Sequence, residues 1–131
     1  MATTTAVANE GNTLRAADTV TTTEGSESHD LDLNDDATIG GAASVALQFN
    51  IAHSSSTGVT INLYSSPDSG TTFDDESLPG GFSTSGTDVI KTVVVDARVA
   101  PYLRVEVVND DGSNNTGNIS ILYAATKWDT N

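Results

Sequence analysis

Apolar and polar residues alternate along much of the chain after residue 28, which is the pattern of β-strands with one buried face. The alternation is clearest over residues 44–53, and it recurs in four further segments: 29–33, 58–65, 101–109 and 118–127. Residues 89–96 are almost continuously apolar, as is typical of a strand covered on both faces. No 3.6-residue pattern runs for ten residues, so the sequence predicts a helix content close to nil.

The segments between these strands have the composition of turns and surface loops. Residues 53–58 form a short connection that ends in Gly58, which predicts an antiparallel hairpin between the strands that flank it. The polar stretch 110–117 predicts a second hairpin. Residues 66–86 are rich in Gly and Pro, and we expect Phe73 and Phe82 to anchor them.

Six or seven short strands separated by turns predict an all-β fold. The expected architecture is a single antiparallel β-sandwich, or a small barrel, of jelly-roll or immunoglobulin-like kind. The chain has 131 residues, which is enough for one domain with its own hydrophobic core. Because it contains no cysteine, a disulfide framework, a Cys-ligated zinc site and a Cys nucleophile are excluded.

Residues 1–28 differ in composition from the rest, being rich in Thr, Ala, Ser and Glu with few large apolar side chains. Such a segment cannot bury enough area to offset its ordering entropy alone. We therefore expect an extended N-terminal arm at 1–28, either mobile or ordered only against another element, and then as an added edge strand. The predicted sandwich domain covers 29–131 and ends in a short C-terminal tail.

Trp128 lies past the last predicted strand, where it either caps the sandwich or fills a pocket on a partner, the cap being favoured. Together with the isolated apolar residues of the arm, it completes a candidate partner interface: Val7, Leu14, Val20 and Trp128.

Eighteen acidic residues against five basic ones give a formal net charge of −13. This charge opposes nucleic acids and anionic membrane surfaces, so we expect no partner of either kind. The N-terminal residues have neither the basic nor the apolar region of an export signal. A scattered acidic surface with few Lys fits either a protein that works in concentrated salt or an ordinary soluble one.

Candidate catalytic chemistry is sparse. The two histidines, His29 and His53, lie at a predicted strand start and a predicted hairpin end, where we expect solvated turn residues and not the buried base of a triad. We therefore predict no enzymatic activity. The tyrosines and Trp128 are candidates for a sugar-binding platform, although aromatic residues make up only 5% of the chain.

Neighbouring carboxylates occur in three places: Asp35-Asp36, Asp74-Asp75-Glu76 and Asp110-Asp111. Adjacent residues on a strand point to opposite faces, so these groups are best explained as charged loop tips. A calcium site at 74–76 or 109–115 is the alternative, because Asp and Asn clusters with Gly match oxygen-ligand chemistry. No nucleotide-binding motif occurs, and no cofactor is expected.

Three stretches carry a resemblance to a known family: Tyr64-Ser65-Ser66-Pro67-Asp68-Ser69-Gly70-Thr71-Thr72-Phe73, the strand Pro101-Tyr102-Leu103-Arg104-Val105, and the strand 118–123. In these the chain resembles small β-sandwich virion proteins of tailed viruses, of the capsid decoration (cement) type, over residues 44–127. With the acidic, Lys-poor composition, the resemblance points to a virus of a haloarchaeal host. It carries no catalytic motif.

The resemblance implies a non-enzymatic subunit on the capsid exterior of a virion. Its partners would be the major capsid protein or other virion subunits, and it would be a homo-oligomer or a lattice-bound multimer whose many copies add small binding energies. The arm would dock by strand addition. Two alternatives stay open: a carbohydrate-binding or adhesin module, and a tail or head-tail connector subunit.

Overall fold

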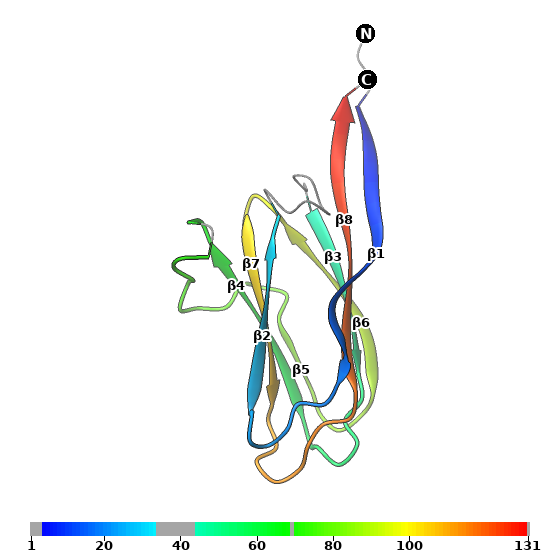
Figure 1. The fold of residues 1–131 in the computed structure, drawn as a ribbon, viewed down its shortest axis with the longest axis vertical. Coiled ribbons are helices and arrows are strands. Elements are labelled where there is room, and N and C mark those ends of the chain that lie inside the picture. Colours follow the sequence, from blue (N-terminus) through cyan, green and yellow to red (C-terminus); the bar gives the residue numbers. More distant parts are fainter. Residues whose placement is uncertain (1–3, 34–43, 69, 131) are drawn as a thin grey trace.

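The computed structural model describes residues 4–33, 44–68 and 70–130, and within them the chain forms eight β-strands and no helix (Figure 1). The prediction of an all-β, helix-free fold is confirmed. No helix in the described part is long and apolar enough to cross a membrane. The strands are β1 (Thr4–Asp18), β2 (Ser26–Asp32), β3 (Ser44–Ile51), β4 (Val59–Ser66), β5 (Phe82–Thr84), β6 (Val89–Asp96), β7 (Tyr102–Asn109) and β8 (Ile119–Thr130).

The strands form two four-stranded sheets that pack face to face, with the orders β1-β8-β3-β6 and β2-β7-β4-β5. Every pair of neighbouring strands in the described part of the chain is antiparallel. Eight strands in these two sheet orders, with the chain crossing repeatedly from one sheet to the other, form the topology of a jelly roll and not of an immunoglobulin domain. Of the two predicted sandwich types, the chain adopts the first.

Alternate residues of the strands fill the space between the sheets. Phe49 is the largest fully buried side chain, and its ring meets Phe82 edge-on with 5.4 Å between the ring centroids. Phe82 therefore anchors its loop as predicted. The other fully buried large apolar side chains come from strands of both sheets and from the segments beside them: Val20, Leu33, Val45, Leu47, Ile51, Ile61, Leu63, Leu103, Ile119 and Ile121.

Both predicted hairpins are wrong. β3 pairs with β6 and β8, whereas β4 pairs with β5 and β7, so residues 53–58 cross from one sheet to the other. The loop 110–117 likewise joins β7 of one sheet to β8 of the other. A short, Gly-ended connection fits either a hairpin or a crossover in a thin sandwich, and local sequence does not distinguish them.

The prediction that 89–96 is covered on both faces is also wrong. β6 is an edge strand, and its outward side chains Ile90 and Val94 are 65% and 68% exposed. Lys91 places its ammonium group 4.6 Å from the centroid of the Phe82 ring at this edge. A lysine on an edge strand discourages further strand addition there.

The segment predicted as an arm is divided between the two sheets. β1 is the extended edge strand that its Thr-rich composition predicts, and it pairs with β8 from Thr4 to Asp18 with three register shifts. Val20 lies in the core, and β2 spans the boundary predicted at residue 28. Part of the predicted arm is therefore integral to the sandwich.

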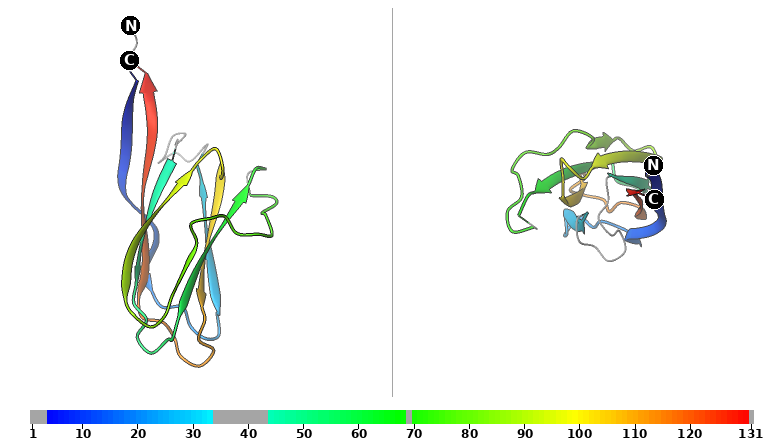
Figure 2. Two further views of the ribbon diagram at one scale, coloured as in Figure 1. Left: turned by 180° about the vertical axis from the view of Figure 1, so that it is seen from behind. Right: turned by 90° about the horizontal axis from the view of Figure 1, so that it is seen from above.

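β1 and β8 together extend beyond the end of the sandwich as a two-stranded ribbon (Figures 1 and 2). The pairing of β8 with β3 stops at Thr126, whereas its pairing with β1 continues to Thr130. Residues 4–7 and 127–130 thus pair only with each other among the described strands, and we call them the ribbon. Trp128 lies within β8, so the predicted C-terminal tail is part of a strand.

Candidate interaction surfaces

The outer face of the β1-β8-β3-β6 sheet bears a block of side chains without a single charge. The outward side chains of β6, β3 and β8 align in three rows, and each row crosses all three strands. We call these nine residues the neutral face: Ile90, Asn50, Ser120; Thr92, Gln48, Leu122; Val94, Ala46, Ala124. In a chain with a net charge of −13, such a surface is distinct from its surroundings.

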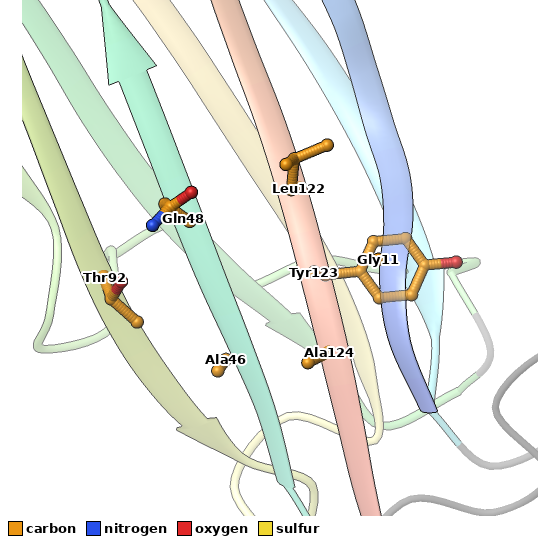
Figure 3. A pocket seen from close by; sticks show the side chains of 7 residues that line it. All are labelled: Gly11, Ala46, Gln48, Thr92, Leu122, Tyr123 and Ala124. Atoms are coloured by element: carbon orange, nitrogen blue, oxygen red, sulfur yellow. The ribbon is translucent and has the colours of Figure 1, made fainter. Parts of the chain in front are cut away.

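Four large hydrophobic side chains are exposed in the described part of the chain, and three of them lie on the neutral face: Ile90, Val94 and Leu122. Leu122 is 41% exposed. Beside Leu122 the face is hollowed by about 270 Å³ (Figure 3). Small residues form part of this hollow, namely Gly11, Ala46 and Ala124. Gly11 has a φ of 74° and lies where the pairing of β1 with β8 shifts register between Asn9 and Asn12.

The opposite outer face, on the β2-β7-β4-β5 sheet, is polar and charged. Arg104 donates two hydrogen bonds to the carboxylate of Asp30, at 2.8 and 3.1 Å, and its guanidinium lies 3.8 Å from the centroid of the Phe73 ring. The pairing with Asp30 raises the pKa of Arg104. Phe73 also contacts Tyr102 edge-on. Phe73 therefore anchors its loop as predicted, on the outside of the sandwich.

A hollow of about 310 Å³ lies on this polar face. Its lining combines aromatic, acidic and basic side chains: Ser28, Tyr64, Phe73, Asp74, Asp75, Arg104 and Glu106. Of the predicted sugar-platform residues, only Tyr64 and Tyr102 belong to this sheet, because Tyr123 is buried in the other one and Trp128 lies in the ribbon.

His53 is the chief departure from the expected chemistry, because it is fully buried and not solvated. Its Nε2 lies 2.6 Å from Oγ1 of Thr84, and its Nδ1 lies 3.5 Å from Oδ1 of Asp88. The order hydroxyl, imidazole, carboxylate is that of a hydrolytic triad.

The hydrogen bonds of this group have two arrangements, set by the tautomer of His53. The Thr84 hydroxyl lies 2.6 Å from Nε2 of His53 and 3.3 Å from the carbonyl oxygen of Val59, and its single proton goes to only one of them. With the ring proton on Nδ1, His53 accepts from Thr84 and turns an N–H towards the Asp88 carboxylate; with the ring proton on Nε2, His53 donates to Thr84 and Nδ1 is a buried atom without a hydrogen-bond partner. In both arrangements the imidazole is fully buried, so a substrate reaches it only if the structure opens locally.

His29 lies inside β2 and not at its start, and its side chain is partly exposed. Its Nε2 is 3.4 Å from Oε2 of Glu27, which also accepts a hydrogen bond from Arg15. Arg15 is almost fully buried and donates further hydrogen bonds to the carbonyls of Asp18, Thr19 and Ile119. Arg15 was not anticipated as a structural centre, although it is the first basic residue in a long acidic stretch.

The four residues predicted to form a partner interface do not form one surface. Val20 is fully buried in the core and cannot contact a partner, and Leu14 is partly buried against the core. Val7 and Trp128 belong to the ribbon, where Val7 pairs with Lys127 and Trp128 pairs with Ala6. The orientation of their side chains lies outside what the structure describes, and so does the question of whether Trp128 caps the sandwich.

The acidic loop at 109–115 uses its carboxylates for hydrogen bonds within the protein. Asp111 accepts hydrogen bonds from the amides of Ser113, Asn114 and Thr57 and from the side chain of Asn114. The Asn114 side chain, followed by the Ser113 amide, lowers the pKa of Asp111 to about 2. Among the described residues, no three His, Asp or Glu side chains form a group that could hold a metal ion. Asp35 and Asp36 lie outside the described residues.

No protein-family model matches the chain, and no curated protein matches its sequence. The fold is similar to that of a deletion mutant of the Penaeus vannamei nodavirus capsid protein, solved as a T=1 subviral particle, with a TM-score of 0.55 and 9% identity over 95% of this chain and 96% of that one. It is also similar to a carbohydrate-binding module, CBM28, specific for non-crystalline cellulose, with a TM-score of 0.50 and 12% identity over 83% of this chain and 70% of that one.

A third similar structure is the SPBc2 prophage-derived protein YomS, which has a TM-score of 0.49 and 18% identity over 97% of this chain and 96% of that one. Identities this low carry information on fold alone. The chain is thus an all-β, jelly-roll-like sandwich whose fold resembles that of a viral capsid protein.

Proposed function

We propose that this chain is a non-enzymatic structural subunit of a virion, most concretely a capsid decoration subunit that binds the outer shell and bridges neighbouring subunits. The observation that carries the proposal is the ribbon of residues 4–7 and 127–130, which projects from a rigid jelly roll. The likeness in fold to a nodavirus capsid protein supports it as a shared architecture.

The ribbon suits a bridging role because of its backbone. β1 is an edge strand, and β8 has no neighbour other than β1 beyond Thr126 in the described part of the chain. Each strand of the ribbon therefore offers unpaired amide and carbonyl groups to a strand of the major capsid protein. Each contact is small, and many copies on a symmetric shell add up to stable attachment.

The non-enzymatic part of the proposal is supported by the state of the two histidines. The ring of His53 is fully buried, so a substrate in solution has no direct access to it. His29 lies beside Glu27, and the described residues provide it with no hydrogen-bonded hydroxyl nucleophile.

The first experiment locates the chain by mass spectrometry of purified virions and by imaging them. We expect the protein on the exterior of the head, in copy numbers that follow the shell lattice. A location in the tail or at the head-tail joint would favour the alternative of a tail or connector subunit.

The second experiment removes the ribbon. A variant that starts at Glu10 and ends at Thr126 keeps the pairing of β8 with β3 and should melt cooperatively. We expect it to lose binding to stripped virions, and we expect proteases to cut residues 1–9 of the intact protein only when it is free. Undiminished binding of the trimmed variant would contradict the role of the ribbon.

A glycan-binding module is the second candidate, favoured by the hollow on the polar face. Tyr64, Asp74 and Asp75 line this hollow. A tyrosine ring can stack on a sugar ring, and carboxylates can accept hydrogen bonds from its hydroxyl groups. The guanidinium of Arg104 already covers one face of Phe73, which reduces the aromatic surface on offer. Binding on a glycan array that disappears in Tyr64→Ala would support this candidate over the first.

A further inference from the structure

We propose that the neutral face is a self-association surface, through which two copies of this chain pack back to back about a two-fold axis. The proposed contact forms between copies of the purified protein and needs neither the ribbon nor a virion. Three features of the neutral face support it: its lack of charge, its shape and the position of Gln48.

Charge selects the partner. Two copies carry the same net charge of −13, so surfaces with unpaired acidic groups repel their own counterparts. A basic foreign partner would gain by docking on an acidic surface, whereas a second copy can approach closely only where charge is absent. All nine positions of the neutral face meet that condition.

A two-fold contact brings the same surface of both copies together, so that surface must be complementary to itself. The neutral face meets this requirement, because it carries both projecting side chains and a hollow. Leu122 and Val94 are exposed aliphatic side chains, and the hollow beside Leu122 is formed in part by Ala46, Ala124 and Gly11. Figure 3 shows Leu122 on β8 among the residues that line this hollow. An aliphatic side chain of one copy can therefore enter the hollow of the other, and the reverse contact follows by symmetry.

Gln48 occupies the middle of the middle row, between Thr92 and Leu122. A residue on a two-fold axis meets its own counterpart, and a carboxamide is self-complementary because it both donates and accepts hydrogen bonds. A carboxylate or an ammonium group in this place would repel its counterpart. The chemistry of the central residue thus matches the symmetry of the proposed contact.

The area of the neutral face limits the expected affinity between two copies. Three strands about 4.8 Å apart, with three outward residues each at a spacing of about 6.8 Å, cover roughly 300 Å² per copy. A standard interface buries about 800 Å² per partner, so the pairing should be reversible, with a dissociation constant between about 10 μM and about 1 mM.

The test is sedimentation equilibrium from about 10 μM to about 1 mM protein in about 1 M KCl, where repulsion between copies is screened. We expect a monomer-dimer equilibrium that Leu122→Asp weakens at least tenfold. Ser28→Asp is the matched control, since Ser28 is exposed on β2 in the other sheet. Equal weakening by both variants would assign the effect to net charge and overturn the proposal.

A covalent trap provides the second measurement. The chain has no cysteine, so a disulfide in a single-cysteine variant must join two molecules. Oxidised Gln48→Cys should yield a covalent dimer, and Ser28→Cys, exposed on β2 in the other sheet, should not. A wild-type monomer at every concentration would overturn the proposal. Loss of virion binding in Leu122→Asp, with the wild type monomeric, would assign the face to a different partner.

Discussion

Arg15 of β1 and Glu27 of β2 form an ion pair, 2.8 Å from Nη2 to Oε2, that joins the two sheets at their open edge. The Arg15 side chain is almost fully buried, and its remaining donors are used by the carbonyls of Asp18, Thr19 and Ile119. A single cation thus fastens β1 to the sandwich below the ribbon. The guanidinium suits this place because its planar group donates in several directions at once.

We expect Arg15→Met to destabilise the protein by about 3 kcal/mol, because Glu27 and three carbonyls lose their partner together. Urea unfolding at neutral pH measures the change. Arg98→Met is the matched control, since the Arg98 side chain is 90% exposed and its pairing with Asp96 at the surface should contribute much less than the buried Arg15. If both variants unfold at the wild-type midpoint, Arg15 does not fasten β1 to the sandwich.

The hydrogen bond between His53 and Thr84 predicts a structural role for both residues. Thr84→Val keeps the shape of the side chain but leaves Nε2 of His53 buried without its hydrogen-bond partner, so we expect a loss of about 1–3 kcal/mol in unfolding free energy. Thr71→Val, at an exposed loop position, is the control.

The same variant tests the absence of catalysis. Neither the wild type nor Thr84→Val should hydrolyse p-nitrophenyl acetate above the rate of the buffer. Hydrolysis by the wild type that vanishes in Thr84→Val would mean that the Thr84, His53 and Asp88 group is an active site after all.

Stability should fall in acid because of two carboxylates, Asp96 at the end of β6 and Asp111 in the loop that follows β7. The side chain and amide of Arg98 lower the pKa of Asp96 from 3.8 to about 2, and the contacts of Asp111 lower its pKa from 3.8 to about 2. A lowered pKa in the folded state means that the stabilisation is present above about pH 4 and is lost as the pH falls towards 2.

The measurement is the melting temperature between pH 5 and pH 2 for the wild type and for Asp111→Asn. The variant should melt lower at pH 5 and show a smaller decrease on acidification. Asp75→Asn removes an exposed carboxylate of another loop and serves as the control. Parallel curves for the wild type and Asp111→Asn would show that Asp111 does not contribute to the acid sensitivity.

Salt should stabilise the fold. A net charge of −13 on a small domain produces self-repulsion, and raising KCl from about 0.1 M to about 3 M shortens the screening length several-fold. We expect the melting temperature to rise with KCl, and to rise less in a triple variant that neutralises Asp74, Asp75 and Glu76. A melting temperature independent of KCl in the wild type would argue against a protein adapted to concentrated salt.

The alternation of apolar and polar residues predicted the strands well, because it depends only on which side chains point into the core. Residues 44–53 and 101–109 correspond closely to β3 and β7, and the inward set of β3 is the predicted one. Strand pairing depends instead on contacts between distant segments. The connection at 53–58 therefore looked like a hairpin, although β3 finds its partners in β6 and β8.

The candidate surfaces were less accessible to sequence reasoning. Val20 looked isolated in a polar stretch, yet its amide is hydrogen-bonded to Thr116 and its side chain is in the core. The neutral face becomes visible only when β6, β3 and β8 are placed side by side. Its signal was present in the nine outward positions that form the three rows, which hold Ala, Gln, Asn, Ser, Thr and aliphatic residues but no Asp or Glu.

β1 begins and β8 ends at one tip of the molecule, opposite the loops at 19–25 and 110–118 (Figures 1 and 2). A protein domain fused to either terminus would sit at the tip that the proposed attachment needs, and would block it. A peptide inserted at Gly112, which has open space around it, would instead be presented at the far end. If the subunit attaches by its ribbon, this loop is the place for displaying foreign epitopes on the particle.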